Sequence, residues 1–353
     1  MSIETLTRAA EQFSGARTDH QAEPLLQVRG LKKHFALSKG KPLFGGHGKV
    51  VRAVDGVDFE VMKGETLGVV GESGCGKSTT ARLLMQLIEP SAGEVVFDGR
   101  VVGSRELPLK EFRRQVQMVF QDSYASLNPR LTIEDSIAFG PRVHGVSARE
   151  ATARAHDLLA RVGLEPARFA ERYPHELSGG QRQRVNIARA LALQPRVVIL
   201  DEAVSALDKS VEAQVLNLLL DLKAEFGLTY VFISHDLNVV RFISDRVMVM
   251  YLGQVAEVGP SEALFEHPAH PYTNALLSSM PSMDPDHRTE EVPLSGDPPN
   301  PIDPPAGCRF HPRCAHAALV CSSIEPPRVL RAQQSVACLI HQRGSGHPEA
   351  LPA

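Results

Sequence analysis

No stretch of the 353-residue sequence approaches the roughly 18 consecutive apolar residues that a membrane-spanning helix requires. Residues 1–20 are polar and carry both signs of charge, so we expect no signal peptide. The formal net charge is −3, and no basic excess favours a nucleic-acid partner. These absences predict a cytosolic chain that reaches a membrane only through partners.

The length exceeds that of one typical domain, and we expect a main domain of about 250 residues with an appendage. Residues 1–24 are predicted to be a flexible lead, and residues 25–260 the main domain. Residues 261–353 are a predicted C-terminal extension, which contains a proline-rich linker and a cluster of cysteines.

Short apolar segments alternate with helical patterns through the main domain, which is typical of an α/β fold with a largely parallel sheet and helices on both faces. A helical subdomain is predicted between about residues 122 and 195. Residues 38–49 are rich in glycine and lysine and are predicted to be a loop. Strands are expected in ETLGVVG and at Leu25–Val28, Leu31–Phe35, Val50–Val61, Val116–Phe120, Val197–Leu200, Tyr230–Ile233 and Val247–Tyr251.

A glycine-rich phosphate loop follows one of these strands and precedes a helical segment. Its glycines let backbone N–H groups surround phosphates, and the helix N-terminus adds a positive dipole end. Lys77 is predicted to reach the β- and γ-phosphates, and Ser78 to ligate Mg²⁺. Cys75 is most simply a small space-filling residue. The residues that match G-x-x-x-x-G-K-S, with the next one, are Gly71, Glu72, Ser73, Gly74, Cys75, Gly76, Lys77, Ser78 and Thr79.

Two carboxylates end the apolar strand Val197–Leu200. Asp201 at the strand tip is predicted to hold Mg²⁺ through water, as in other phosphate-loop NTPases. Glu202 follows it, where a carboxylate can polarise an attacking water as general base. Together with the phosphate loop, this pair predicts nucleotide hydrolysis.

The segment Leu177-Ser178-Gly179-Gly180-Gln181 precedes a helical stretch, and here the sequence resembles the ABC ATPase family, whose signature is LSGGQ. Ser178 is a good helix N-cap, and the glycines leave backbone N–H groups open to an anion. The resemblance implies an ABC ATPase core, and a head-to-tail dimer in which each signature closes on the partner's nucleotide.

Other positions match further motifs of this family. Gln121 matches the glutamine that senses Mg²⁺ and contacts the membrane subunit, and Asp208 ends the matching D-loop, Ser205-Ala206-Leu207-Asp208. His235 matches the switch histidine at the γ-phosphate, and Phe35 the aromatic residue that stacks on adenine. Residues 203–204 are Ala-Val where many members carry Pro-Thr, a change from which we expect little effect on hydrolysis.

Several stretches, including MVFQDSYASLNPR, HPYTNALLSSMP and GCRFHPRC, resemble the ATP-binding subunits of dipeptide and oligopeptide importers, in detail the second of two such ATPases. The resemblance implies a sister ATPase subunit, two transmembrane permeases, an extracytoplasmic binding protein and a peripheral location on the cytoplasmic face of the inner membrane. Importers of nickel or glutathione are the alternative within this branch. A soluble ABC ATPase outside transport is less favoured, because a coiled-coil insertion and a second cassette are both absent from the sequence.

The cysteines of the C-terminal extension are spaced C-x5-C-x6-C-x16-C. The importer branch carries cysteines at matching places, and four thiolates suit an iron–sulfur cluster such as [4Fe-4S]. Zinc is the competitor, although the short spacings usual in structural zinc sites are missing. Free or oxidised thiols also remain open, and His311 and His316 are potential substitute ligands. The four residues are Cys308, Cys314, Cys321 and Cys338.

Overall fold

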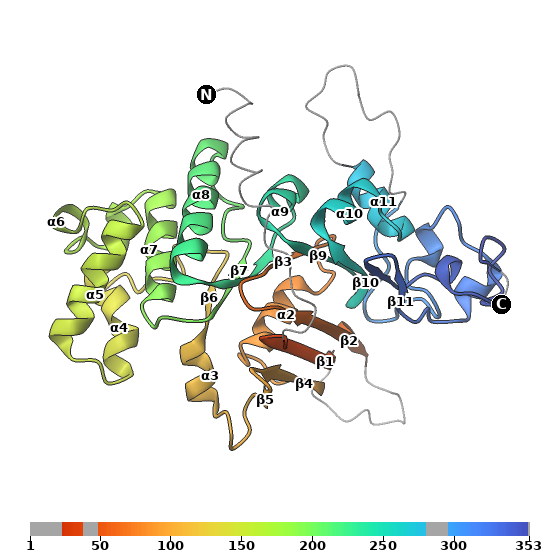
Figure 1. Ribbon diagram of the computed structural model, residues 1–353, viewed down its shortest axis with the longest axis horizontal. Coiled ribbons are helices and arrows are strands. Elements are labelled where there is room, and N and C mark those ends of the chain that lie inside the picture. The colour runs from red at the N-terminus through yellow and green to blue at the C-terminus, as the bar shows by residue number, and fades with distance from the viewer. Residues whose placement is uncertain (1–22, 38–48, 280–295, 352–353) are drawn as a thin grey trace.

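The computed structural model describes residues 23–37, 49–279 and 296–351. Two sheets lie at the centre of the molecule, with a group of helices at one end and the C-terminal extension at the other (Figure 1). Residues 1–22 of the predicted lead, residues 38–48 of the predicted loop and residues 280–295 of the predicted linker lie outside the described residues.

The larger sheet has eight strands in the order β11-β12-β10-β9-β3-β8-β7-β6. Five of them are mutually parallel, as the alternation of strands and helices predicts. They are β6 (Val116–Val119), β7 (Val197–Asp201), β8 (Thr229–Ile233), β3 (Thr66–Val70) and β9 (Arg246–Tyr251). The remaining three pair antiparallel at one edge: β10 (Gln254–Pro260), β12 (Gln334–Val336) and β11 (Val329–Arg331).

A second, antiparallel sheet has the order β2-β1-β4-β5. Its strands are β2 (Val50–Val61), β1 (Leu26–Ala36), β4 (Ala92–Phe97) and β5 (Arg100–Val101). This sheet shares a core with α2 (Lys77–Leu84), α3 (Leu109–Gln115) and one face of the larger sheet. Helices therefore cover both faces of the larger sheet as predicted, with the antiparallel sheet added on this face, and β1 is one irregular strand where two segments were predicted.

The parallel strands read as continuous apolar runs because both of their faces are buried. In β7, Val197 and Ile199 belong to the core shared with the antiparallel sheet. Val198 and Leu200 belong to the core on the opposite, helical side. The two-residue period of a strand thus sends alternate side chains into two separate apolar layers.

The helical subdomain lies within the predicted range and is visible at the left of Figure 1. Thr132 and Ser147 begin two of its helices by accepting hydrogen bonds from the amides of Asp135 and Glu150. Its helices are α4 (Ile133–Val143), α5 (Ala148–Arg161), α6 (Pro166–Phe169), the 3-10 turn at Pro174–Glu176 and α7 (Gly179–Leu191). Helices α8 (Lys209–Phe226) and α9 (Leu237–Ile243) follow between strands of the larger sheet.

The C-terminal extension starts with α10 (Ser261–Glu266) and α11 (Pro271–Ser278), continues through 3-10 turns at His311–Arg313, Leu319–Ser322 and Leu339–His341, and contributes β11 and β12. Because β12 pairs with β10, the extension is part of the larger sheet.

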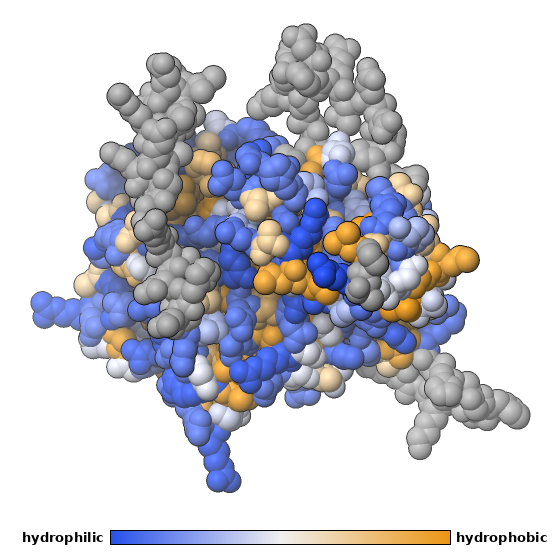
Figure 2. Space-filling view, turned by 45° about the vertical axis from the view of Figure 1, so that its right-hand side comes forward, coloured by the Kyte–Doolittle hydropathy of each residue, from blue (hydrophilic) through white to orange (hydrophobic). Residues whose placement is uncertain are grey.

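The face turned forward in Figure 2 is mainly hydrophilic, with apolar residues gathered in several separate groups. Among the described residues, no helix combines the length and apolarity needed to cross a membrane.

Candidate functional site

The phosphate loop connects β3 to α2. Gly76, the residue before α2, has a φ of 110°, and a Cβ atom there would lie 2.4 Å from the carbonyl oxygen of Ala53. Only glycine combines this backbone conformation with such a close approach. The Lys77 ammonium donates hydrogen bonds to the carbonyl oxygens of Gly71, at 2.7 Å, and Glu72, at 3.0 Å. The loop is therefore held around the amine that the sequence predicts to meet phosphates.

A cavity of about 390 Å³ opens over this loop. It gathers residues that are widely separated in the sequence and that were predicted from separate motifs. Its lining comprises Ala53, Ser73, Gly74, Gly76, Lys77, Ser78, Thr79, Gln121, Glu202 and His235.

Two carboxylates at the end of β7 stand beside the loop. The Ser78 hydroxyl donates to Asp201 Oδ1 at 3.0 Å. Burial raises the pKa of Asp201 above its ordinary value, although the hydrogen bond from Ser78 works in the opposite direction. A hydroxyl and a carboxylate at this separation are oxygen donors of the kind that Mg²⁺ prefers.

Glu202 has a φ of 49°, an uncommon backbone conformation for a residue with a side chain. Such conformations cluster at functional sites, where the surrounding structure holds them. The Gln121 amide donates to Glu202 Oε2 at 2.7 Å, and His235 Nδ1 lies 3.5 Å from Glu202 Oε1. The carboxylate therefore stands between two side chains that were predicted independently.

The LSGGQ residues lie elsewhere, at the exposed N-terminus of α7. The Ser178 hydroxyl accepts from the Gln181 amide at 3.3 Å, and the Gln181 side chain accepts from the Ser178 amide at 2.9 Å. This reciprocal cap fixes the first turn of the helix. Gly179 and Gly180 form that turn, and none of these four residues lines the cavity over the chain's own phosphate loop. Asp208, before α8, does not line it either.

Phe35 lies near the end of β1, opposite Val51 of β2. Its side chain is 40% exposed, and it is not among the residues that line the cavity. Ala53, two positions after Val51 on β2, does line the cavity. Phe35 is therefore near the edge of the site rather than inside it.

All four cysteines of the extension line one small cavity of about 20 Å³. Burial raises the pKa of Cys308 to about 11 and that of Cys338 to about 12, so these thiols are protonated at neutral pH. Across residues 23–37, 49–279 and 296–351, no three His, Cys, Asp or Glu side chains are arranged to hold a metal ion. The cysteines of the described residues thus share one cavity without being arranged around a metal ion, and the iron–sulfur or zinc site stays a prediction.

Two family models match the chain. The model for "ABC transporter" matches residues 54–205, and the model for "Oligopeptide/dipeptide transporter, C-terminal region" matches residues 256–321. The second match covers the start of the extension and three of its four cysteines.

Curated relatives match over most of their length. A probable peptide ABC transporter ATP-binding protein of Sinorhizobium fredii is 52% identical, over 90% of both chains. The di/tripeptide transport ATP-binding protein of Pseudomonas aeruginosa is 49% identical, over 90% of this chain and 97% of the relative. The dipeptide transport ATP-binding protein of Escherichia coli K12 is 48% identical, over 90% of this chain and 94% of the relative.

Solved structures agree with these relatives. A subunit of an ABC transporter complex from Clostridium perfringens has a TM-score of 0.59 at 28% identity, over 69% of this chain and 92% of that chain. A dimeric ATP-binding cassette in a post-hydrolysis state with ADP and Pi has a TM-score of 0.57 at 30% identity, over 67% of this chain and 98% of that chain. The chain therefore belongs to the family of ABC transporter ATP-binding proteins. The predicted fold class is confirmed, and so is the prediction of an ATPase that uses ATP with Mg²⁺.

Several residues that support the site were not predicted from the sequence. Ala53 lines the cavity, and the Tyr272 hydroxyl accepts a hydrogen bond from the Glu72 amide of the phosphate loop. Arg309 and Arg313 lie in GCRFHPRC, a stretch in which only the cysteines and histidines were considered as functional residues. The presence of two arginines between Cys308 and Cys314 was the feature of the sequence that could have drawn attention to them.

Proposed function

We propose that this chain hydrolyses ATP to drive the import of dipeptides and oligopeptides across the cytoplasmic membrane. The observation that carries the proposal is the single cavity that joins the phosphate loop to Gln121, Glu202 and His235. The peptide substrate rests on the names of relatives about 50% identical, which are peptide transport ATP-binding proteins.

Polar residues in and beside the cavity have separate roles in this proposal. Lys77 binds the β- and γ-phosphates, and Ser78, Gln121 and Asp201 would hold Mg²⁺, which would supply positive charge to the transferring phosphoryl group. Glu202 orients and polarises the attacking water, and His235 contacts the γ-phosphate. The stacking of Phe35 on adenine belongs to the same proposal, with Phe35 at the rim of the cavity.

A second chain completes the site. The N-terminus of α7 is exposed and does not line the cavity over the chain's own phosphate loop. Its residues are Ser178, Gly179, Gly180 and Gln181. We place it against the γ-phosphate held by a sister ATPase subunit, with Asp208 near the same interface. The post-hydrolysis structure of a related cassette is dimeric, which supports this arrangement.

A second surface feature, a groove, is the proposed binding site for the permease partners. A groove of about 710 Å³ lies between the helical subdomain and the ends of α2 and β6, and includes the exposed side chains of Phe120 and Phe139. Gln121 lines both this groove and the nucleotide cavity. A permease helix in the groove would sense the nucleotide through Gln121. Two permeases and an extracytoplasmic binding protein complete the proposed importer, with this chain peripheral on the cytoplasmic side.

The four cysteines are proposed to hold a metal group, with an iron–sulfur cluster preferred over zinc. Their shared cavity and the all-sulfur donor set support this assignment. Because burial keeps Cys308 and Cys338 protonated, metal binding has to displace protons and draw the thiolates together. Iron and sulfide analysis of anaerobically purified protein tests the cluster; stoichiometric zinc supports the competitor, and a metal-free protein rejects both.

Replacement of the predicted general base tests the hydrolytic site. The Glu202→Gln protein should bind ATP as tightly as the wild type but hydrolyse it about 10²–10⁴-fold more slowly, because a general base contributes about that much. Glu94 on β4, whose side chain is 41% exposed and does not line the cavity, provides a matched Glu94→Gln control with unchanged hydrolysis. Normal hydrolysis by the Glu202→Gln protein would contradict the assigned role.

Transport by a strain that lacks this subunit tests the substrate. Uptake of labelled dipeptides and oligopeptides should disappear and return with the wild-type gene, but not with the gene for Glu202→Gln. Uptake of nickel and glutathione, measured in the same strain, should be unaffected. Loss of nickel or glutathione uptake with retained peptide uptake would instead assign the chain to that solute.

A further inference from the structure

The segment Cys308–Cys314 of the extension reaches the nucleotide site through two buried arginines. The side chain of Arg309 is 7% exposed and that of Arg313 is 6% exposed. Guanidinium groups this buried require charged partners. Both find them in the ATP-binding core, on elements next to the phosphate-loop cavity.

Arg313 binds the phosphate loop directly. Its two terminal nitrogens lie 2.8 and 3.0 Å from the two carboxylate oxygens of Glu72, and it also donates to the Tyr251 hydroxyl at 3.3 Å. A two-point arginine–carboxylate pair fixes orientation as well as distance. Glu72 is the second residue of the loop, directly after Gly71.

The backbone of Glu72 is held as firmly as its side chain. Its amide donates to the Tyr272 hydroxyl at 2.9 Å, so a second group of the extension fixes the same residue. Its carbonyl oxygen accepts from the Lys77 ammonium at 3.0 Å. The position of the phosphate-binding lysine is therefore connected to Arg313 through one residue.

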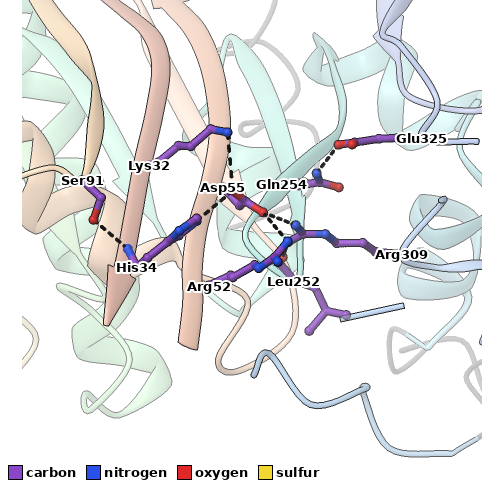
Figure 3. Close-up of polar contacts among 9 residues, drawn as sticks. All are labelled: Lys32, His34, Arg52, Asp55, Ser91, Leu252, Gln254, Arg309 and Glu325. Atoms are coloured by element: carbon purple, nitrogen blue, oxygen red, sulfur yellow. Dashed lines mark hydrogen bonds and ion pairs between the residues drawn. The ribbon is translucent and has the colours of Figure 1, made fainter. Parts of the chain in front are cut away.

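Arg309 reaches the other side of the cavity. It binds the Asp55 carboxylate on β2 and the carbonyl oxygen of Leu252 in the turn between β9 and β10 (Figure 3). Asp55 also accepts from His34 at 2.8 Å, on the strand that carries Phe35. Next to Leu252, the Gly253 amide donates to the Cys75 carbonyl oxygen at 2.8 Å. The β9–β10 turn, which Arg309 holds, is thus hydrogen-bonded to the phosphate loop at Cys75.

Phe310 keeps the two arginines in place. Its ring is 3% exposed, and its centroid lies 5.3 Å from those of both Tyr251 and Tyr272. These are the tyrosines whose hydroxyls contact Arg313 and Glu72. Buried aromatic pairs at this separation pack with a defined orientation. The segment is therefore rigidly seated against the phosphate loop.

We propose that Arg313, supported by Arg309, is a positioning residue for ATP: the extension holds the phosphate loop in the shape that binds the triphosphate. This inference rests on the ATP site proposed above. Arg313 does not line the nucleotide cavity, and it acts through Glu72. Loss of Arg313 leaves a largely buried Glu72 carboxylate without its guanidinium partner, so the loop relaxes. Glu202, Gln121 and His235 are untouched, and chemistry in the filled site proceeds at its usual rate.

The test compares ATP affinity with turnover in the full-length chain. Arg313→Gln should raise both Kd and KM for ATP about tenfold, the loss expected for a buried charged hydrogen-bond pair, while kcat stays within about twofold. Arg313→Lys, which retains the charge and one bond, should lie between Arg313→Gln and wild type. The double variant Glu72→Gln/Arg313→Gln should bind ATP no more weakly than Arg313→Gln alone, because the unpaired carboxylate is gone.

Glu325→Gln is the matched control. Glu325 accepts a hydrogen bond from Gln254 and so also joins the extension to the core (Figure 3). It does not line the cavity over the phosphate loop. Its KM for ATP should match the wild type. Unchanged ATP affinity in folded Arg313→Gln, additive losses in the double variant, or a fall in kcat at constant KM would each overturn the positioning role. A wild-type chain that binds no ATP would reject the proposed ATPase itself.

Discussion

The ATP-binding core and the C-terminal extension are built by different means. In the core, apolar side chains fill continuous layers on both faces of the larger sheet. In the extension, a separate apolar cluster contains only Ala269, Val336 and Cys338, with Ile340 packed against it. The extension instead joins the core through strand pairing, buried arginines and Phe310. Apolar packing positions the residues around the phosphate-loop cavity, whereas the extension combines polar connections with a few apolar side chains, Leu264, Tyr272 and Phe310, that join the core.

The largest expected difference between the two regions concerns packing. Leu219 on α8 is 1% exposed, and Leu219→Ala should lower the free energy of unfolding by about 2–5 kcal/mol. Leu330 in the extension is 79% exposed, and Leu330→Ala should change that free energy by about 0.5 kcal/mol or less. Urea unfolding of both variants measures the difference. Equal losses would show that the extension is packed like the core.

Alanine substitutions at one glycine in each region should give a smaller and more local difference between the regions. Gly76 in the phosphate loop and Gly346 in the extension both have positive φ, at 110° and 81°. Alanine at either position carries about 1–3 kcal/mol of backbone strain. At Gly346 the nearest atom to a Cβ is 4.0 Å away, whereas at Gly76 the backbone of Ala53 is in the way. Gly76→Ala should therefore also abolish ATP binding in equilibrium titrations, and Gly346→Ala should leave it intact; similar ATP affinities would contradict this distinction.

The smallest expected effect is a pH dependence of the polar connection between the regions. Burial of Asp55 opposes its ionisation, but hydrogen bonds from His34 and Arg309 outweigh burial and hold its pKa below the ordinary 3.8. A carboxyl with a lowered pKa stabilises the fold above its unfolded-state pKa, and this contribution is lost as pH falls through the folded-state pKa. The difference in thermal stability between wild type and Asp55→Asn should therefore be largest near neutral pH and shrink below about pH 4. A constant difference would contradict the role of the Asp55 charge.

Local patterns were sufficient to predict most of the core. The alternation of Val50–Val61 gave β2 with its observed bounds, and the apolar runs before Gly71 and Asp201 gave two parallel strands. Apart from Ala53, the residues that line the cavity were predicted because each belongs to a motif in which residue type and neighbouring element go together. Strand β12 was missed because three residues carry no detectable period, and its pairing with β10 and β11 makes it a strand.

The partners of the extension's arginines could not be predicted from the sequence for a related reason. Arg313 and Glu72 are 241 positions apart, and Arg309 and Asp55 are 254 apart. Neither pair forms a recognised spacing, and an arginine in a loop is ordinarily solvated. The grouping of the four cysteines was predictable, because their number and spacing indicated one site, but the arrangement of their thiols depends on packing.

The hairpin of β11 and β12 has one more consequence, which concerns association between molecules. It occupies the hydrogen-bonding edge of β10, which would otherwise present unpaired N–H and C=O groups to solvent. Open edges of this kind recruit strands from other chains. A protein shortened before Val329 should therefore self-associate through β10, and the terminal hairpin protects the sheet from aggregation.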